Sequence, residues 1–232
     1  MIITFASLKG GIGKTTLAIA LANYVSGVSN TKIKVYDLDA QKSFYNKWMD
    51  DQNSELPKLY DVEFIETLEE RPPNMDRAQI IHYKESDDLF LFDLEGTMDR
   101  KYTEVLVHSD FIIIPFEYSD ISVKSTLIFK NLLGLLESEA QRIFIRYKYE
   151  KCFNYLNQQE IDHELSKYGI LTETPVLRRS CLQNIDTRKL TFAQKCAVKK
   201  PFNEILEVIK ISKKRPENFK TDNRFSALGA ES

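Results

Sequence analysis

Short apolar runs alternate along this chain with stretches of helical spacing. Uninterrupted runs of Ile, Val, Leu and Phe are typical of parallel strands that are buried on both faces. The runs predict strands at Ile2–Ala6, Lys32–Asp37, Val62–Ile65, Leu89–Asp93, Phe111–Pro115, Arg142–Tyr147 and Pro175–Leu177. The stretches between them predict helices at Lys14–Ser26, Gln41–Asp51, Asp76–Tyr83, Ile121–Leu136, Gln158–Tyr168 and Pro201–Lys213. This order predicts an α/β fold with a mostly parallel twisted sheet of about seven strands and helices on both faces.

The length of 232 residues suits one α/β domain with a large core. We expect that domain to span residues 1–213. Residues 214–232 are mostly polar and lack the apolar surface that would offset the entropy lost on ordering, so they are predicted to form a flexible tail.

The composition is consistent with the predicted α/β fold. The chain is 43% hydrophobic and 28% charged, as in ordinary globular proteins. No apolar run approaches the roughly 18 residues that a membrane span needs, and the first residues lack the basic segment of a signal peptide, so a cytoplasmic location is expected. Cys152, Cys181 and Cys196 lack the close spacing of a zinc or redox site, and we interpret them as buried reduced thiols.

Charge is divided unevenly along the chain although the net charge is only −2. Residues 1–140 carry 14 basic and 23 acidic side chains, a balance of −9. Residues 141–232 carry 18 and 11, a balance of +7. A basic surface that binds a partner is therefore expected late in the chain.

The first predicted strand runs directly into a glycine-rich loop and then into a helix. Glycines in this setting let backbone N–H groups point at phosphate oxygens, and the helix N-terminus adds partial positive charge. The Lys14 ammonium would reach the β- and γ-phosphates, and the Thr15 hydroxyl would ligate Mg²⁺. The pattern predicts a P-loop ATP site made by Lys9, Gly10, Gly11, Ile12, Gly13, Lys14, Thr15 and Thr16.

The loop departs from the usual P-loop pattern, because Leu8 stands where the first glycine belongs and a second lysine, Lys9, precedes Lys14 by five residues. In these features it resembles the deviant P-loop of the ParA/MinD ATPase family. The segment from Val35 to Gln41 resembles the family's D-x-D-P-Q motif, with Ala40 in place of proline. The run that ends at Asp93, followed by Gly96, resembles its second switch.

Three aspartates, Asp37, Asp39 and Asp93, lie at or just after the carboxyl ends of predicted strands, where parallel sheets bind ligands. The resemblance implies that Asp37 and Asp93 hold Mg²⁺ through water, and that Asp39 is the catalytic carboxylate that activates the attacking water. The Gly96 amide would reach the γ-phosphate. Glu95 replaces a proline common in the family and is either an exposed loop acid or a second group that orients water.

In this family the signature lysine crosses the interface of a nucleotide sandwich dimer. The resemblance therefore implies an ATP-dependent homodimer, with Lys9 acting beside Lys14 and Asp39 in catalysis and facing the ATP of the partner. A lysine that acts within its own subunit is the alternative.

The predicted base pocket departs from the family pattern at the end of the sixth predicted strand. The family has an adenine-reading asparagine after its later strand, whereas this chain has Arg146, Tyr147 and Lys148. The segment around Pro175 resembles the family segment that borders the base, so Pro175 is assigned to the ATP site and adenine is preferred. No N-K-x-D guanine motif occurs in this region.

A cluster of Arg178, Arg179, Arg188 and Lys189 follows the last predicted strand. It suits sequence-independent DNA binding, in which phosphate neutralisation dominates affinity. A solvated helix face explains the same charges equally well.

The leading hypothesis is an Mg²⁺-dependent ATPase switch that serves partition or transfer of a plasmid or mobile element, with non-specific DNA and a ParB-like protein as partners and an association with the nucleoid. Residues 36–48 resemble ParA-type proteins of Bacteroides-type conjugative elements. One alternative is a membrane-associated MinD-like ATPase, for which Phe202, Ile205, Leu206 and Ile209 would supply a terminal amphipathic helix. The other is a metabolic P-loop enzyme.

Overall fold

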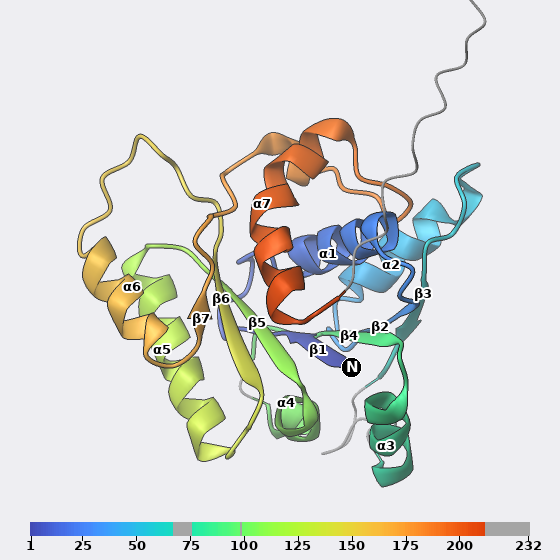
Figure 1. Cartoon of the computed structure of the whole chain (residues 1–232), viewed down its shortest axis with the longest axis horizontal. Coiled ribbons are helices and arrows are strands. Elements are labelled where there is room, and N and C mark those ends of the chain that lie inside the picture. Colours follow the sequence, from blue (N-terminus) through green and yellow to red (C-terminus); the bar gives the residue numbers. More distant parts are fainter. Residues whose placement is uncertain (67–75, 98, 212–232) are drawn as a thin grey trace, which may run out of the picture.

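The computed structural model of the chain describes residues 1–66, 76–97 and 99–211. Seven strands form one sheet, and every neighbouring pair of strands is parallel (Figure 1). The strand order is β3-β2-β4-β1-β5-β6-β7, so β1 lies in the middle. The strands are β1 Ile2–Phe5, β2 Ile33–Asp37, β3 Asp61–Phe64, β4 Leu89–Asp93, β5 Phe111–Phe116, β6 Gln141–Arg146 and β7 Ile170–Leu171. The predicted α/β fold is confirmed.

Helices cover both faces of the sheet (Figure 1). One face carries α1 Lys14–Val28, α2 Ser43–Asp50 and α7 Phe192–Val208, and the other carries α3 Arg77–Glu85, α4 Thr103–His108, α5 Asp120–Leu135 and α6 Gln158–Ser166. Short 3₁₀ turns lie at η1 Asp51–Asn53, η2 Arg100–Tyr102 and η3 Ser180–Leu182. Two separate apolar cores, one on each face, fix the sheet between the helices.

Two element predictions were wrong. The segment Pro175–Leu177 is not a strand, because proline has no N–H to donate to a ladder, and the segment makes one isolated bridge between Tyr149 and Leu177. The seventh strand is the earlier pair Ile170–Leu171. The last helix begins at Phe192, nine residues before the expected start, since Thr191 and Gln194 form a capping box there and Pro201 lies inside the helix. The predicted tail, residues 214–232, lies outside the described residues.

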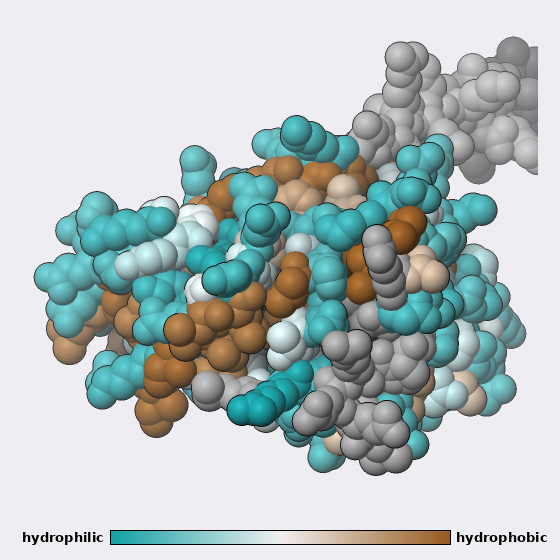
Figure 2. Space-filling model, turned by 90° about the horizontal axis from the view of Figure 1, so that it is seen from below, coloured by the Kyte–Doolittle hydropathy of each residue, from teal (hydrophilic) through white to brown (hydrophobic). Residues whose placement is uncertain are grey.

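The outward face of α5 carries an apolar stripe. Ile121, Ile128 and Leu135 recur at seven-residue intervals and are 74%, 51% and 81% exposed. Residues spaced by seven lie on one side of a helix. Figure 2 shows hydrophobic side chains gathered on the left of the molecule seen from below, the side on which Figure 1 places α5.

The terminal apolar stripe, in contrast, is buried. Phe202 and Ile205 are fully buried, and Leu206 and Ile209 are 1% exposed. All four belong to the core on the α1 side of the sheet. They hold α7 on the domain, so these four side chains are not available to insert into a membrane in this conformation. No helix in the described ranges has the length and apolar character that crossing a bilayer requires.

Candidate functional site

The glycine-rich loop lies between the carboxyl end of β1 and the start of α1, as the sequence predicts. Gly11 and Gly13 have φ angles of 69° and 92°, in the left-handed region that favours glycine. Helix α1 begins at Lys14, and no side chain caps its first turn. The backbone N–H groups of this turn therefore remain free to bind an anion.

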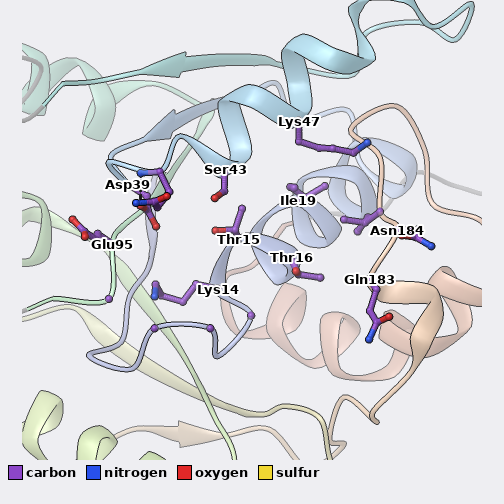
Figure 3. A pocket seen from close by; sticks show the side chains of 16 residues that line it. Lys14, Thr15, Thr16, Ile19, Asp39, Ser43, Lys47, Glu95, Gln183 and Asn184 are labelled. Carbon is purple, nitrogen blue, oxygen red and sulfur yellow. Dashed lines mark hydrogen bonds between the residues drawn. The ribbon is translucent and has the colours of Figure 1, made fainter.

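A cavity of about 780 Å³ opens above this loop (Figure 3). Several predicted residues line it, namely Gly10, Gly11, Gly13, Lys14, Thr15, Thr16, Asp39 and Gly96. Eight further residues, which the sequence does not assign to ATP binding, also line it: Ile19, Gln41, Ser43, Lys47, Glu95, Gln183, Asn184 and Ile185. A volume of this size falls within the range of small-molecule and cofactor sites.

Lys14 is only 5% exposed at the base of the cavity. Burial lowers the pKa of its ammonium below the usual lysine value, and the nearby carboxylates of Asp93, Asp39 and Glu95 oppose that shift. An anionic ligand would raise the pKa of the Lys14 ammonium again, because negative charge beside it favours the protonated form.

Asp93 ends β4 beside β1 and is completely buried. Neither of its carboxylate oxygens accepts a hydrogen bond in the described part of the chain. Burial raises the pKa of Asp93 well above its usual range, and the negative charge of Asp37 raises it further, whereas Thr15 and Lys14 partly offset these effects. A buried carboxylate that accepts no hydrogen bond, with a hydroxyl and an ammonium group nearby, has oxygens free for a cation or its bound water.

Asp37 ends β2 directly beside Asp93 in the sheet. Its carboxylate accepts hydrogen bonds from the backbone N–H of Asp39 at 3.0 Å and of Tyr45 at 2.9 Å. Burial raises its pKa, and these hydrogen bonds counteract the shift. Asp37 therefore shapes the turn into α2 in addition to placing a carboxylate near the cavity.

Asp39 reaches the cavity itself, as Figure 3 shows. One of its oxygens accepts a hydrogen bond from the Gln41 N–H at 2.8 Å, which fixes the side chain at the turn. Glu95 lies beside it in the figure and accepts a hydrogen bond from the Tyr102 hydroxyl at 3.3 Å. Two carboxylates thus line the same end of the cavity.

These residues fit Mg²⁺. The described residues hold no group of three or more His, Cys, Asp and Glu side chains that could bind a metal by themselves. Mg²⁺, however, is commonly held by one or two carboxylates, a hydroxyl, waters and substrate phosphates. The unpartnered oxygens of Asp93, with Thr15 and Asp37 nearby, supply that donor set.

Lys9 does not line the cavity. Its Nζ lies 3.5 Å from Glu117 Oε2 and 3.4 Å from Ser119 Oγ. Glu117 also pairs with Lys148 at 3.0 Å, and the Lys148 ammonium donates to the Gly11 carbonyl at 3.1 Å. In this conformation Lys9 is held by a carboxylate of its own chain at the outer edge of the loop.

Two glycines are required by close contacts around the loop. A Cβ on Gly96 would lie 2.9 Å from the Gly10 backbone nitrogen, so the loop after β4 packs directly against the glycine-rich loop. A Cβ on Gly13 would overlap the ring of Tyr147. Tyr147 therefore covers the start of α1 from the β6 side.

Two further predicted ATP-site residues, Pro175 and Ile12, do not line this cavity. Pro175 lines a separate cavity of about 680 Å³, so the assignment of Pro175 to the ATP site is not supported. The Val176 N–H donates to the Arg146 carbonyl at 2.8 Å, which holds this segment beside the end of β6. Ile12 is 1% exposed and belongs to the packed base of the loop.

The four predicted DNA-contacting residues are not equivalent. Arg178, Arg179 and Lys189 are exposed, although Arg178 pairs with Glu150 at 2.7 Å. Arg188 is only 5% exposed, and its Nε donates to the Asp51 carbonyl at 2.9 Å. Arg188 thus serves the packing of its loop and is not available to DNA in this conformation.

The prediction of buried cysteines was wrong in part. All three cysteines are free, but Cys152 and Cys196 are exposed and Cys181 is partly exposed. They lie in loops and on the outer side of α7, where the hydrophobic pattern does not determine burial.

Comparisons with known proteins agree with this geometry. A family model described as the CobQ/CobB/MinD/ParA nucleotide binding domain matches residues 3–217. The curated protein sequences contain no significant match.

Solved structures share the fold. A plasmid partition protein from Borrelia burgdorferi B31 bound to AMPPNP is 21% identical, with a TM-score of 0.64, and the match covers 90% of this chain and 97% of that one. The MinD cell division protein of Aquifex aeolicus is 14% identical at a TM-score of 0.66, with 91% and 98% covered. The ParA of pNOB8 bound to nonspecific DNA is 15% identical at 0.57, with 90% and 98% covered. At these identities the similarity shows the fold alone.

Proposed function

The chain belongs to the CobQ/CobB/MinD/ParA nucleotide-binding family, and from that premise we propose that it is an ATPase switch that binds Mg²⁺-ATP and dimerises on ATP. One observation carries the proposal. Lys14, Thr15 and Asp39 line a single cavity, and the unpartnered carboxylate of Asp93 lies beneath them. This set of donors provides for phosphates, a metal ion and an attacking water at once.

Each residue has a distinct task in this proposal. The free N–H groups at the start of α1 and the Lys14 ammonium hold the β- and γ-phosphates. Bound Mg²⁺ would neutralise charge that develops on the phosphates during transfer. Thr15 and Asp93 would hold this ion. The Asp39 carboxylate, fixed by the Gln41 N–H, would position the attacking water and accept its proton.

Lys9 supplies the link to dimerisation. Its contact with Glu117 is long at 3.5 Å, and the two side chains are 28% and 21% exposed. Ion pairs at such exposure are weak, at about 0–1 kcal/mol. A phosphate group of a second chain would attract the Lys9 ammonium more strongly, because it carries more charge. We assign Lys9 to the ATP of the partner chain on that basis.

Non-specific DNA is the proposed second partner, and a ParB-like protein is the proposed stimulating partner. The support for DNA is the positive balance of residues 141–232 together with the exposure of Arg179 and Lys189. The pNOB8 ParA, a protein with a similar fold, has been solved bound to nonspecific DNA. A role in partition or transfer of a plasmid or mobile element, in the cytoplasm and at the nucleoid, would follow from both partners.

The alternatives receive less support. A MinD-like membrane helix would need a free apolar face on α7, but that face is buried. A metabolic enzyme would need a second substrate.

Phosphate release from Mg²⁺-ATP by the protein alone, and its increase when duplex DNA is added, tests the proposal. An absence of ATP hydrolysis with and without DNA, or hydrolysis that requires a small-molecule substrate, would contradict it.

A further inference from the structure

The cavity extends well beyond the residues that would hold phosphates. Asp39 and Glu95 lie at one end in Figure 3, and Gln183 and Asn184 lie at the other. The wall between these two ends is α1. A nucleotide whose phosphates lie on the glycine-rich loop would therefore place its base toward the segment 183–185.

The segment 183–185 is anchored to α7. Gln194 is only 2% exposed, and its Nε2 donates to the Cys181 carbonyl at 2.8 Å and to the Asn184 carbonyl at 3.1 Å. Its Oε1 accepts from the Thr191 N–H at 2.8 Å. A buried amide that is satisfied in this way fixes the backbone of the loop.

The following residues are anchored to α1 and to the end of α2. The Asn23 amide donates to the Asp186 carbonyl at 2.7 Å and to the Lys189 carbonyl at 3.3 Å. The Asp51 carboxylate accepts from the Thr187 N–H at 2.7 Å. The loop is thus held on three sides, as a preorganised recognition element should be.

The side chains that this loop presents have no partners of their own. Gln183 and Asn184 are exposed, and neither side-chain amide makes a hydrogen bond within residues 1–66, 76–97 and 99–211. A carboxamide offers a donor and an acceptor side by side, which matches the N6 donor and N7 acceptor of adenine. The buried side chains of Ile19 and Ile185 line the same part of the cavity and supply apolar contact for a base.

The last residue of β6 and the segment after it make other contacts. The Arg146 guanidinium donates to the Thr172 carbonyl at 2.6 Å, and the Lys148 ammonium donates to the Gly11 carbonyl at 3.1 Å. The ring of Tyr147 lies against Gly13. None of these three side chains lines the cavity.

We infer that the side-chain amides of Gln183 and Asn184 recognise the adenine base, in place of a residue after β6. The inference rests on the proposed function, because it requires a nucleotide with its phosphates on the glycine-rich loop. It assigns adenine specificity to a loop that is fixed by Gln194, Asn23 and Asp51.

Calorimetric titration with Mg²⁺ and three probes tests this assignment: AMPPNP, GMPPNP and inorganic tripolyphosphate. The variants are Gln183→Ala, Asn184→Ala and the double substitution. Asn131→Ala is the matched control, because Asn131 is an exposed amide on α5 that does not line the cavity. Thermal unfolding of each variant checks that the fold is retained.

The double variant should bind AMPPNP roughly tenfold more weakly, should lose most of its preference for AMPPNP over GMPPNP, and should bind tripolyphosphate as the wild type does. An AMPPNP affinity equal to that of Asn131→Ala would overturn the inference. A loss of equal size for AMPPNP and tripolyphosphate would also overturn it, since the loop would then act through the fold. Wild-type protein that binds none of the probes would overturn the proposed function and this inference together.

Discussion

At the residue scale, the site is built from side chains whose burial is unfavourable until a ligand is bound. Asp93 is the clearest case, because a fully buried carboxylate without hydrogen bonds destabilises the fold in its charged form. Lys14 is a second case of the opposite charge. A bound phosphate beside Lys14 and a metal ion near Asp93 would offset both costs.

Asp93→Asn should stabilise the protein without ligand by about 1–3 kcal/mol near neutral pH, because the neutral amide requires neither a buried charge nor the uptake of a proton on folding. The same variant should lose Mg²⁺-dependent hydrolysis. Urea unfolding and phosphate release measure the two effects. A destabilised Asn variant would contradict this account of Asp93.

The stability of the wild type should also depend on pH through Asp93. Its pKa in the folded state is raised, so the protonated carboxyl contributes stability that is fully present below the ordinary value of 3.8 and is lost as the pH rises through the raised value. The difference in unfolding free energy between Asp93→Asn and wild type should therefore grow as the pH rises from 5 to about 8. A difference that does not change over this interval would argue against a raised pKa.

Asp39→Ala should lower kcat by roughly 100- to 10,000-fold and leave ATP affinity nearly unchanged, because the carboxylate acts on water and not on the phosphates. Glu160→Ala removes an exposed carboxylate on α6 and serves as the control. If Asp39→Ala weakened ATP binding as much as it slowed turnover, Asp39 would have a structural role.

At the element scale, the loops at the carboxyl ends of β1 and β4 act as one unit, since Gly96 packs on the backbone of Gly10. A change in one loop, such as the arrival of a γ-phosphate, is therefore transmitted to the other. This contact gives the second switch a physical coupling to the nucleotide.

Gly96→Ala should displace the glycine-rich loop, because the new Cβ would lie 2.9 Å from the Gly10 nitrogen, and should weaken AMPPNP binding by about tenfold or more. Gly134→Ala is the matched control. Gly134 lies inside α5 with nothing within 4 Å of a new Cβ, so alanine should stabilise the helix by about 0.5–1 kcal/mol. Equal AMPPNP affinities for the two variants would show that the loops are not coupled.

The same scale shows how far the sequence determines the structure. Apolar runs predict six of the strands, and the glycine-rich loop with its strand and helix can be found by pattern alone. The two-residue β7 is too short to give a pattern. Pro201 is wrongly predicted as the start of the last helix, because the capping box at Thr191 starts α7 earlier. The loop at 183–185 has no motif. It reaches the cavity only through tertiary contacts of Gln194, Asn23 and Asp51, which no local pattern contains.

At the scale of the whole molecule, the proposed function connects the nucleotide site with a second chain and with DNA. DNA affinity should fall steeply with salt, and Arg179→Ala and Lys189→Ala should each reduce the slope of log affinity against log salt by about 1. Arg188→Ala should instead lower the melting temperature, because this side chain is buried and donates a hydrogen bond to the Asp51 carbonyl. Slopes that do not change in the first two variants would place the DNA surface elsewhere.

The central claim is that ATP joins two chains through Lys9. Light scattering of size-separated protein with ATP, ADP or no nucleotide tests it most directly, on the wild type, on Lys9→Ala and on Lys32→Ala, an exposed lysine just before β2. Wild type and Lys32→Ala should change from one chain to two with Mg²⁺-ATP only, and Lys9→Ala should remain a single chain while it still binds ATP. A wild type whose mass is the same with ATP and ADP, or a Lys9→Ala protein that dimerises as the wild type does, would contradict the claim.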